Sequence, residues 1–344
     1  MSQEAIKRVQ QAIEEIKKGK MVIMMDDEDR ENEGDLVYAA TFSTPEHVNF
    51  MAKEARGLIC TPLTKELASK LDLLPMVSNN DSNHETAFTI SIDSATASTG
   101  ISAMERDDCI KKLSQPQTTK DDFVRPGHIF PLIAKDGGVL VRTGHTEGSV
   151  DLCKLSGVAP VAVICEIIKD DGSMARADDL DIFATKHDLH IVYISDIVEY
   201  RLAHEKLISK VDTLDVVFRS KDVTKHIYKD HLGREHTVIE FGDISKVANV
   251  KFHNIGLDKD LILDDKRYFA LHNSIEYLKD HGGLLVFLDT KVISHEQAKE
   301  YGIGAQILKD FGIKDINLLT TTKDTEFVGL AGFGLNVVEK TEVL

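Results

Sequence analysis

The chain has 344 residues, which is more than a single hydrophobic core usually supports, so we expect two domains. Its composition, 42% hydrophobic and 28% charged, is typical of globular proteins, and its net charge of −16 argues against general binding to nucleic acid or acidic lipid, because both require a basic surface. No apolar stretch reaches the roughly 18 to 20 residues of a membrane helix, and the N-terminal sequence lacks the apolar core of a signal peptide, so we expect a cytoplasmic protein.

The first part of the chain mixes helices and strands. Apolar residues at three- and four-residue steps predict a helix over residues 3–18, and residues 21–25 and 34–40 predict two strands joined by an acidic loop. The other expected helices are 47–55 and 177–188, and the other expected strands are 87–93, 138–142, 159–168 and 190–195. This order predicts an α+β domain with a mixed sheet rather than regular βαβ repetition.

Residues 196–211 form a charged stretch that we expect to be helical, and strand-like segments separated by polar turns follow it. Beyond it, the expected strands are 215–220, 236–242, 247–253, 284–288 and 316–321, and the expected helices are 269–283 and 297–312. We therefore place the domain boundary near residue 205, which gives a domain of residues 1–204 and a second α+β domain of residues 205–344.

The acidic loop has an unusual density of charge. Residues 26–35 read DDEDRENEGD, with seven carboxylates and one arginine. An EF-hand that starts at Asp29 is excluded, because its twelfth position is Ala40, where calcium requires a bidentate glutamate. Two interpretations remain: a solvated acidic loop, or a loop that binds Mg²⁺ or Mn²⁺ through one or two carboxylates while a substrate completes the shell.

A second stretch, RTGHTEGS at residues 142–149, suits an anion and a metal ion. Glycine permits close backbone approach, arginine and threonine side chains suit a phosphate, and the imidazole of His145 can complete a metal shell. A capped turn with a surface histidine would give the same pattern, and on this stretch alone the capped turn is the favoured interpretation.

Three other stretches carry polar side chains that could act in a site. Residues 125–132, RPGHIFPL, place His128 after a Pro-Gly turn, and residues 98–102, STGIS, add hydroxyl groups and a glycine. Glu166 lies inside the apolar run 159–168. Its carboxylate is therefore either paired with a buried partner or has a raised pKa and transfers protons.

Taken in order, the stretches DDEDRENEGDL, STGISAMER, RPGHIFPL, RTGHTEGSVDL and CEII resemble the 3,4-dihydroxy-2-butanone 4-phosphate synthases of riboflavin biosynthesis. The resemblance implies conversion of D-ribulose 5-phosphate to 3,4-dihydroxy-2-butanone 4-phosphate and formate, with Mg²⁺ or Mn²⁺ and without an organic cofactor. A metal of this kind acts as a Lewis acid on the sugar oxygens, and side chains must move protons.

The resemblance also implies roles for particular residues. Glu31 and His145 would bind the metal, and Asp35, His128 and Glu166 would be catalytic, with Asp35 a candidate for proton abstraction. The implied substrate contacts are Arg30, Glu31, Asp35, Arg142, Thr143, Gly144, His145, Thr146 and Glu166. The acids without a role in this scheme, Asp26, Asp27, Glu28 and Asp29, would either shape the site or form a solvated flank. Because the family is homodimeric with sites at the subunit interface, we expect a homodimer in which His128 could serve the partner's site.

The second half resembles GTP cyclohydrolase II in four patches, at residues 230–236, 301–313, 316–320 and 329–339. The chemistry of that domain resembles a zinc hydrolase whose metal is held by three cysteine thiolates. The four cysteines of this chain have no CxxC spacing, and all lie in the first half: Cys60, Cys109, Cys153 and Cys165. We therefore expect no disulfide framework, no zinc and a domain that keeps the fold without the reaction.

Other features of this half agree with a lost activity. The GTP-binding stretch of the family is not recognisable in residues 289–300, and residues 320–326 replace its Asn-Asn-Pro turn. The expected roles are then dimer support, regulation or docking of other riboflavin enzymes. The alternative is a bifunctional enzyme that also has GTP cyclohydrolase II activity through a rebuilt metal site.

Two metal-based alternatives are weaker. The spacing of the second-half histidines matches no zinc motif, so we interpret them as surface or core residues: His226, His231, His236, His253, His272, His281 and His295. A protein that only sequesters divalent cations would have no use for Arg142 and Thr146. The sequence therefore favours an enzyme.

Overall fold

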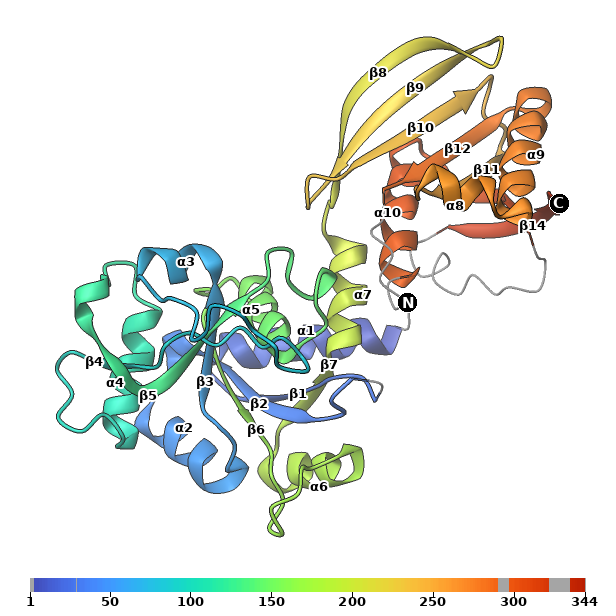
Figure 1. The fold of residues 1–344 in the computed structure, drawn as a ribbon. Helices are drawn as coiled ribbons and strands as arrows, with labels where there is room; N and C mark the ends of the chain where they lie inside the picture. Colours follow the sequence, from blue (N-terminus) through green and yellow to red (C-terminus); the bar gives the residue numbers. More distant parts are fainter. Residues whose placement is uncertain (1–2, 29, 290–296, 322–334, 344) are drawn as a thin grey trace. The chain divides into compact units, whose positions relative to one another are not determined.

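The computed structural model describes residues 3–28, 30–289, 297–321 and 335–343. The chain divides into two compact units, Gln3–Tyr200 and Arg201 to the C-terminus, and the helix α7 (Ile194–His204) runs across the division. Each unit contains one seven-stranded sheet with helices packed beside it (Figure 1). This confirms the α+β class and the mixed sheet of the first unit.

The first unit has a mixed sheet in the order β4-β5-β3-β6-β2-β1-β7. Its strands are β1 (Val22–Met25), β2 (Gly34–Ala39), β3 (Cys60–Thr64), β4 (Ile92–Ser94), β5 (Phe123–Ala134), β6 (Ala162–Glu166) and β7 (His190–Tyr193). Besides α7, its helices are α1 (Gln3–Lys17), α2 (Pro45–Phe50), α3 (Lys65–Lys70), α4 (Ala103–Leu113), α5 (His145–Leu155) and α6 (Ala177–His187). The β1–β7 and β3–β5 pairs are parallel, and the other pairs are antiparallel.

Both faces of this sheet are covered, which explains why residues 21–25 are apolar without alternation. Ile23 and Met25 belong to a core cluster with residues of α2, α4 and α6. On the opposite face, α1 and α5 pack together against the sheet, and a Cβ on Gly148 of α5 would lie 2.6 Å from the sulfur of Met24. The start of α5 is thereby fixed against β1.

Three local predictions in this unit were wrong. Residues 138–142 form no strand: Gly138–Leu140 is a 3₁₀ helix, because Gly137 and Gly138 adopt positive φ and the Asp151 carboxylate accepts a hydrogen bond from Val139 N at 2.8 Å. In consequence, residues 142–149 follow that turn rather than a strand, and α5 begins at His145.

The expected strand 87–93 is reduced to β4 and single bridges at Phe88 and Thr89. Thr89 N donates to the carbonyl of Pro131, and a proline has no N–H with which to continue the ladder. The expected Pro-Gly turn before His128 is also absent, because residues 125–132 lie within the long strand β5.

The second unit has a mixed sheet in the order β14-β13-β11-β12-β10-β9-β8. Its strands are β8 (Ile208–Phe218), β9 (Lys221–Asp230), β10 (Glu235–Phe241), β11 (Val247–Asn254), β12 (Gly283–Leu288), β13 (Asp315–Thr320) and β14 (Asn336–Glu342), and its further helices are α8 (Asp258–Ile262), α9 (Asp265–His281) and α10 (Gln297–Asp310). Ile275 and Leu278 of α9 pack into a core with Ile239, Phe241 and Leu285.

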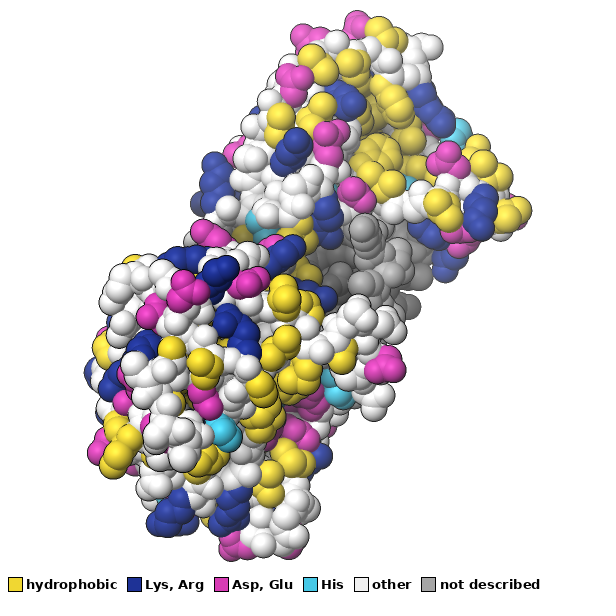
Figure 2. All heavy atoms as spheres, turned by 60° about the vertical axis from the view of Figure 1, so that its left-hand side comes forward, with side chains coloured by type: hydrophobic (Ala, Val, Ile, Leu, Met, Phe, Trp, Pro, Cys, Tyr) yellow, Lys and Arg dark blue, Asp and Glu magenta, His cyan; other side chains and the backbone are white. Residues whose placement is uncertain are grey.

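A cavity of about 370 Å³ lies in this unit beside β11, β13 and α9, with Lys251, His253 and Arg267 among its lining residues. On the face drawn in Figure 2, acidic and basic side chains are interspersed rather than separated into large areas of one sign. None of the helices in the described part of the chain is both long enough and apolar enough to cross a membrane.

Candidate active site

The sheet of the first unit brings three distant stretches together. The acidic loop of residues 26–33 joins the antiparallel strands β1 and β2, so it is held at both ends. On the other side of β2, the register of β6 places Glu166 opposite Asp35. The start of α5 packs over the same end of these strands and carries His145.

Asp26 organises the acidic loop from within. Its side chain is fully buried, and the carboxylate accepts three hydrogen bonds: Oδ2 from Arg30 Nη1 at 2.7 Å and from Glu31 N at 3.1 Å, and Oδ1 from Glu33 N at 2.8 Å. These bonds fold the loop back on the end of β1. Asp27 and Glu28 are exposed, and Asp29 lies outside the described residues.

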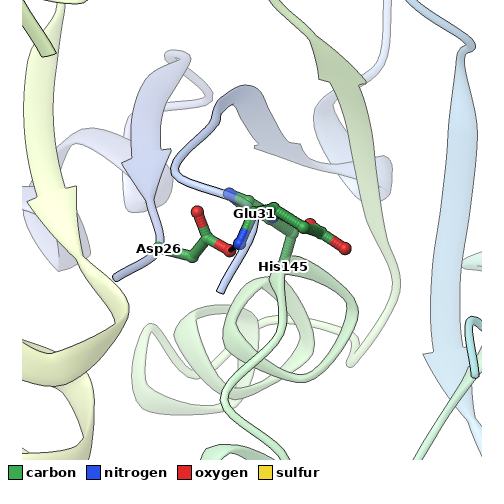
Figure 3. Close-up of side chains that lie close together, drawn as sticks. All are labelled: Asp26, Glu31 and His145. Atoms are coloured by element: carbon green, nitrogen blue, oxygen red, sulfur yellow. Dashed lines mark hydrogen bonds and ion pairs between the residues drawn. The ribbon is translucent and has the colours of Figure 1, made fainter. Parts of the chain in front are cut away.

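Glu31 and His145 form an ion pair at the inner side of this loop. His145 Nδ1 lies 3.5 Å from Glu31 Oε2, and Arg30 Nη1 lies 2.8 Å from the same oxygen. The other ring nitrogen of His145, Nε2, lies 3.2 Å from the Met24 carbonyl, which can only accept a hydrogen bond. Figure 3 shows the side chains of Asp26, Glu31 and His145 gathered at this point.

This group fits a small divalent cation. One ligand atom from each of Asp26, Glu31 and His145 lies within 4.8 Å of the others, and it is the only such group of His, Cys, Asp or Glu side chains in the described residues. Once His145 is neutral, its Nδ1 lone pair points to the Glu31 carboxylate, because Nε2 keeps its proton on the Met24 carbonyl. Both Asp26 oxygens already accept hydrogen bonds from the described part of the loop, whereas only Oε2 of Glu31 does, so Glu31 and His145 are the better placed ligands.

The electrostatics of the site follow from burial and close charges. Burial alone would raise the pKa of Glu31, but the hydrogen bond from His145 and the charge of Arg30 lower it to about 2. Burial alone would lower the pKa of His145, but the charge of Asp35 and the bond to Glu31 raise it to about 9. In the absence of metal, the pair is therefore ionised at neutral pH.

Asp35 and Glu166 are two carboxylates in different environments. Burial raises the pKa of Asp35 to about 7, with further increases from Glu166 and Glu31 and an opposing effect of His145. Its Oδ1 has no hydrogen-bond partner among the described residues. Glu166 is half-buried, and its Oε2 accepts a hydrogen bond from Leu58 N at 2.8 Å, so it is paired with the backbone.

The start of α5 offers an anion-binding element beside the cation site. Arg142 Nη1 lies 2.6 Å from Glu147 Oε2, and Nη2 donates to the carbonyl of His84 at 2.8 Å, which fixes the guanidinium plane. Gly144 precedes the helix, and a Cβ there would lie 2.3 Å from Arg142 Nη1. The N-terminus of α5 and the guanidinium are thus directed to the same place, a combination that favours a phosphate.

These groups line one cavity of about 160 Å³. Its lining residues are Arg30, Glu31, Glu33, Asp35, Cys60, Thr86, Phe88, Leu132, Arg142, His145, Thr146, Ile164 and Glu166. Seven of the residues that the sequence pointed to are therefore in one place: Arg30, Glu31, Asp35, Arg142, His145, Thr146 and Glu166. Thr143 and Gly144 are adjacent in the chain but do not line the cavity.

His128 is not brought to this cavity. It lies on β5 with its side chain 43% exposed, and its ring is bonded to Asp93 rather than to any of the lining residues. Within one chain, the structure therefore does not join His128 to Glu166 and Asp35.

Several residues of the site were not expected from the sequence. Cys60, Thr86 and Phe88 line the cavity, and Glu147 holds Arg142. Cys60 and Phe88 sit in ordinary apolar runs and give no signal. Glu147 could have been found as the acid that follows the phosphate-binding glycine on the first turn of a helix.

The second unit offers no comparable metal site among its described residues. His226 pairs with Glu240 at 2.8 Å, and the buried His236 lies 3.3 Å from Asp230. His231 and His281 are exposed, while His295 lies outside the described residues, as do most of residues 289–300 and 320–326.

Comparisons with known proteins match most of the first unit and the last part of the second. The family model of 3,4-dihydroxy-2-butanone 4-phosphate synthase matches residues 10–200, and that of GTP cyclohydrolase II matches residues 290–342. The 3,4-dihydroxy-2-butanone 4-phosphate synthase of Wolinella succinogenes is 57% identical over 97% of this chain and 96% of its own length.

Two solved structures extend the comparison. RibBX from A. baumannii, a two-domain 3,4-dihydroxy-2-butanone 4-phosphate synthase, matches with a TM-score of 0.82 and 36% identity over 98% of this chain and 99% of that chain. A 3,4-dihydroxy-2-butanone 4-phosphate synthase in complex with two magnesium ions matches with a TM-score of 0.53 and 41% identity over 55% of this chain and 94% of that chain.

Proposed function

The chain belongs to the 3,4-dihydroxy-2-butanone 4-phosphate synthase family, and we propose that the acidic-loop cavity of its first unit carries out the reaction of that family. The protein is a metal-dependent enzyme of riboflavin biosynthesis that converts D-ribulose 5-phosphate to 3,4-dihydroxy-2-butanone 4-phosphate and formate. The observation that carries the assignment to this cavity is the convergence of the Glu31–His145 pair, the buried Asp35 and Arg142 on one small space.

Glu31 and His145 would hold the metal, Mg²⁺ or Mn²⁺. A carboxylate and an imidazole with open positions suit either cation, because the substrate oxygens can complete the shell. When bound, the cation polarises the carbonyl and adjacent hydroxyl groups of the ketose and makes the neighbouring C–H more acidic. Arg30, which is held by Asp26, would contact the sugar from the loop side.

Asp35 would take the proton from carbon. Its environment holds the pKa at about 7, so the carboxylate is a stronger base than an exposed aspartate and is still available in its ionised form near neutral pH. Glu166, opposite Asp35 on β6, would be the second proton-transfer group of the cavity. The hydrogen bond from Leu58 N orients its carboxylate.

Arg142, Gly144 and Thr146 would hold the phosphate, with Thr143 adjacent. The planar guanidinium can donate two hydrogen bonds to one phosphate, and the first backbone N–H groups of α5 add donors and a favourable dipole. The ion pair with Glu147 keeps the guanidinium directed before the substrate arrives.

A homodimer would complete the site. His128 is a proton-transfer group in this scheme, and it does not line the cavity of its own chain, so we assign it to the cavity of a second copy. Mixing two inactive variants, Glu31→Ala and His128→Ala, would restore part of the activity, because a mixed dimer contains one intact cavity. No recovery after subunit exchange would contradict the shared site.

The proposed domains are residues 1–204 for the synthase and 205–344 for a GTP cyclohydrolase II-like domain without that activity. The absence of any cysteine after Cys165 supports this, because the thiolate ligands of the family's zinc cannot form. We propose that the second domain supports the dimer, regulates the enzyme or docks other riboflavin enzymes in the cytoplasm. Formate release from GTP by the full-length protein with added zinc would instead establish the bifunctional alternative.

The synthase assignment is tested by formate release from ribulose 5-phosphate. With Mg²⁺ the purified protein should release formate, and EDTA should stop the release until Mg²⁺ is restored. Glu31→Ala and His145→Ala should abolish turnover, while Glu28→Ala, which removes an exposed acid of the same loop, should retain it. Turnover that continues after metal removal would refute the metal role, and activity in either ligand variant would refute that ligand.

A further inference from the structure

The exposed His128 is held by a buried carboxylate. Asp93 on β4 is 7% exposed, and its two oxygens bind the same residue: Oδ1 accepts from His128 N at 2.8 Å, and Oδ2 lies 2.8 Å from His128 Nδ1. This contact between Asp93 and His128 lies where the β4–β5 pairing shifts register, between Ile92 and Asp93. A side chain that is 43% exposed is therefore fixed at both its backbone and its ring.

The surrounding backbone is built closely around this carboxylate. Gly100 has a φ of +80°, and a Cβ there would lie 2.0 Å from Asp93 Oδ2. A Cβ on Gly127, next to His128, would lie 2.1 Å from the carbonyl carbon of Ile92. Neither position has room for a side chain, so Asp93 has little freedom to move away from the imidazole.

The hydrogen bond to Asp93 determines which ring nitrogen of His128 carries the proton. A carboxylate can only accept a hydrogen bond, so Nδ1 of the neutral ring must be the donor and Nε2 must carry the lone pair. Nε2 has no hydrogen-bond partner among the described residues of its own chain. Nε2 is thus the ring nitrogen that is free to exchange a proton with another molecule.

We infer that Asp93 is a positioning residue of the reaction: it holds His128 with the proton on Nδ1, so that Nε2 faces a reacting group supplied by another molecule. This rests on the proposed function, in which His128 transfers protons in the cavity of a second copy. In that step the substrate gives a proton to Nε2, the ring becomes an imidazolium that Asp93 stabilises while remaining ionised, and the same proton returns to a later intermediate.

The variant Asp93→Asn tests the inference with little change of shape. The amide oxygen can still accept from His128 N, but the amide NH₂ now faces Nδ1 and favours the ring with its proton on Nε2. We expect kcat for formate release to fall about 100-fold or more, the usual contribution of a general acid–base group, with KM for ribulose 5-phosphate within about threefold. Asp108→Asn, the same change on α4, is the matched control and should keep the wild-type kcat.

Two readouts separate positioning from a merely structural role. In a His128→Ala background, Asp93→Asn should reduce kcat no further, because both changes remove one function; a full additional loss would overturn the inference. Nitrogen NMR of the wild-type enzyme should show His128 with a protonated Nδ1 and an unprotonated Nε2. The opposite tautomer would overturn it even if Asp93→Asn did not fold.

The failure of this inference is distinct from that of the proposed function. An inactive wild-type protein would refute the synthase assignment. An active wild-type enzyme in which Asp93→Asn keeps its kcat would refute only the role given to Asp93. Full activity of His128→Ala would refute the role of Asp93 and also the proton-transfer role proposed for His128, while leaving the synthase assignment intact.

Discussion

Replacing Asp26 with alanine tests whether one carboxylate holds the acidic loop in the shape that binds metal. The side chain is fully buried and accepts three hydrogen bonds, one of them from the Arg30 guanidinium. Bonds to a charged group contribute about 1.5–3 kcal/mol each, so the three total roughly 5 kcal/mol at the lower end. Because the freed donors regain water in a surface loop, we expect a net loss of about 3 kcal/mol.

This loss should appear mainly in metal affinity. In the wild-type protein Asp26 orders Glu31 before the cation arrives, whereas in Asp26→Ala the loop must be ordered on binding. If the whole 3 kcal/mol is lost at that step, the Kd for Mg²⁺ rises about 100-fold. Isothermal titration of the free protein with Mg²⁺ measures the change directly, and urea unfolding shows how much of it appears as stability instead.

A simple charge effect has to be separated from the loop effect. Glu28→Ala removes the same charge from an exposed position of the same loop, so it should change the Kd by less than about threefold, as expected for a screened surface charge. If Asp26→Ala binds Mg²⁺ as tightly as Glu28→Ala and unfolds at the wild-type urea concentration, the buried carboxylate does not organise the site.

Three further predictions concern other parts of the molecule. Arg142→Lys should raise KM for ribulose 5-phosphate about 10-fold or more in formate assays, because an ammonium group cannot keep the two-sided contacts of the guanidinium. Lys251→Met should raise the free energy of unfolding by about 1 kcal/mol, measured by urea unfolding. Lys251 is 9% exposed, burial lowers the pKa of its amine, and the Leu319 carbonyl 3.4 Å away accepts its hydrogen bond, so its replacement by an apolar side chain removes a buried cation. Burial and the charges of Lys251 and Arg267 lower the pKa of His253 from 6.5 to about 4. As the pH falls, His253 is therefore protonated in the unfolded chain before it is protonated in the folded one. Its contribution to the free energy of unfolding is fully present above pH 6.5 and is lost as the pH drops toward 4. Between pH 7 and pH 5 the wild type should lose about 1–2 kcal/mol more than His253→Gln in urea unfolding, and equal losses would refute the assignment.

The local sequence was a good guide where a segment is buried on both faces or has a clear helical period. The helix at residues 3–17 and the strands at 22–25 and 162–166 follow directly from such patterns. The strand expected at 138–142 failed because two glycines with positive φ and a distant carboxylate turn the chain there. An apolar run does not show that a side chain from the next helix will accept its backbone hydrogen bond.

In the site, too, some residues were predicted from the local sequence and others were found only in the structure. Seven of the residues that line the cavity were identified from short stretches and from the resemblance of those stretches to a known family. Asp26 was left between shaping the site and forming a solvated flank, and Cys60 was not given a place, because their roles depend on what the loop and the strands enclose rather than on neighbouring residues.

By itself the sequence determined the chemical groups available: a carboxylate-rich loop, an imidazole and a phosphate-binding turn, and a second half without cysteine. Tertiary structure decided which of them act together. The β2–β6 register sets Asp35 against Glu166, the packing of α5 on β1 brings His145 to Glu31, and Asp93 fixes the ring of His128, which does not line the cavity of its own chain. These are contacts between segments far apart in the chain, and local propensity carries no information about them, because burial and register are set by the whole sheet.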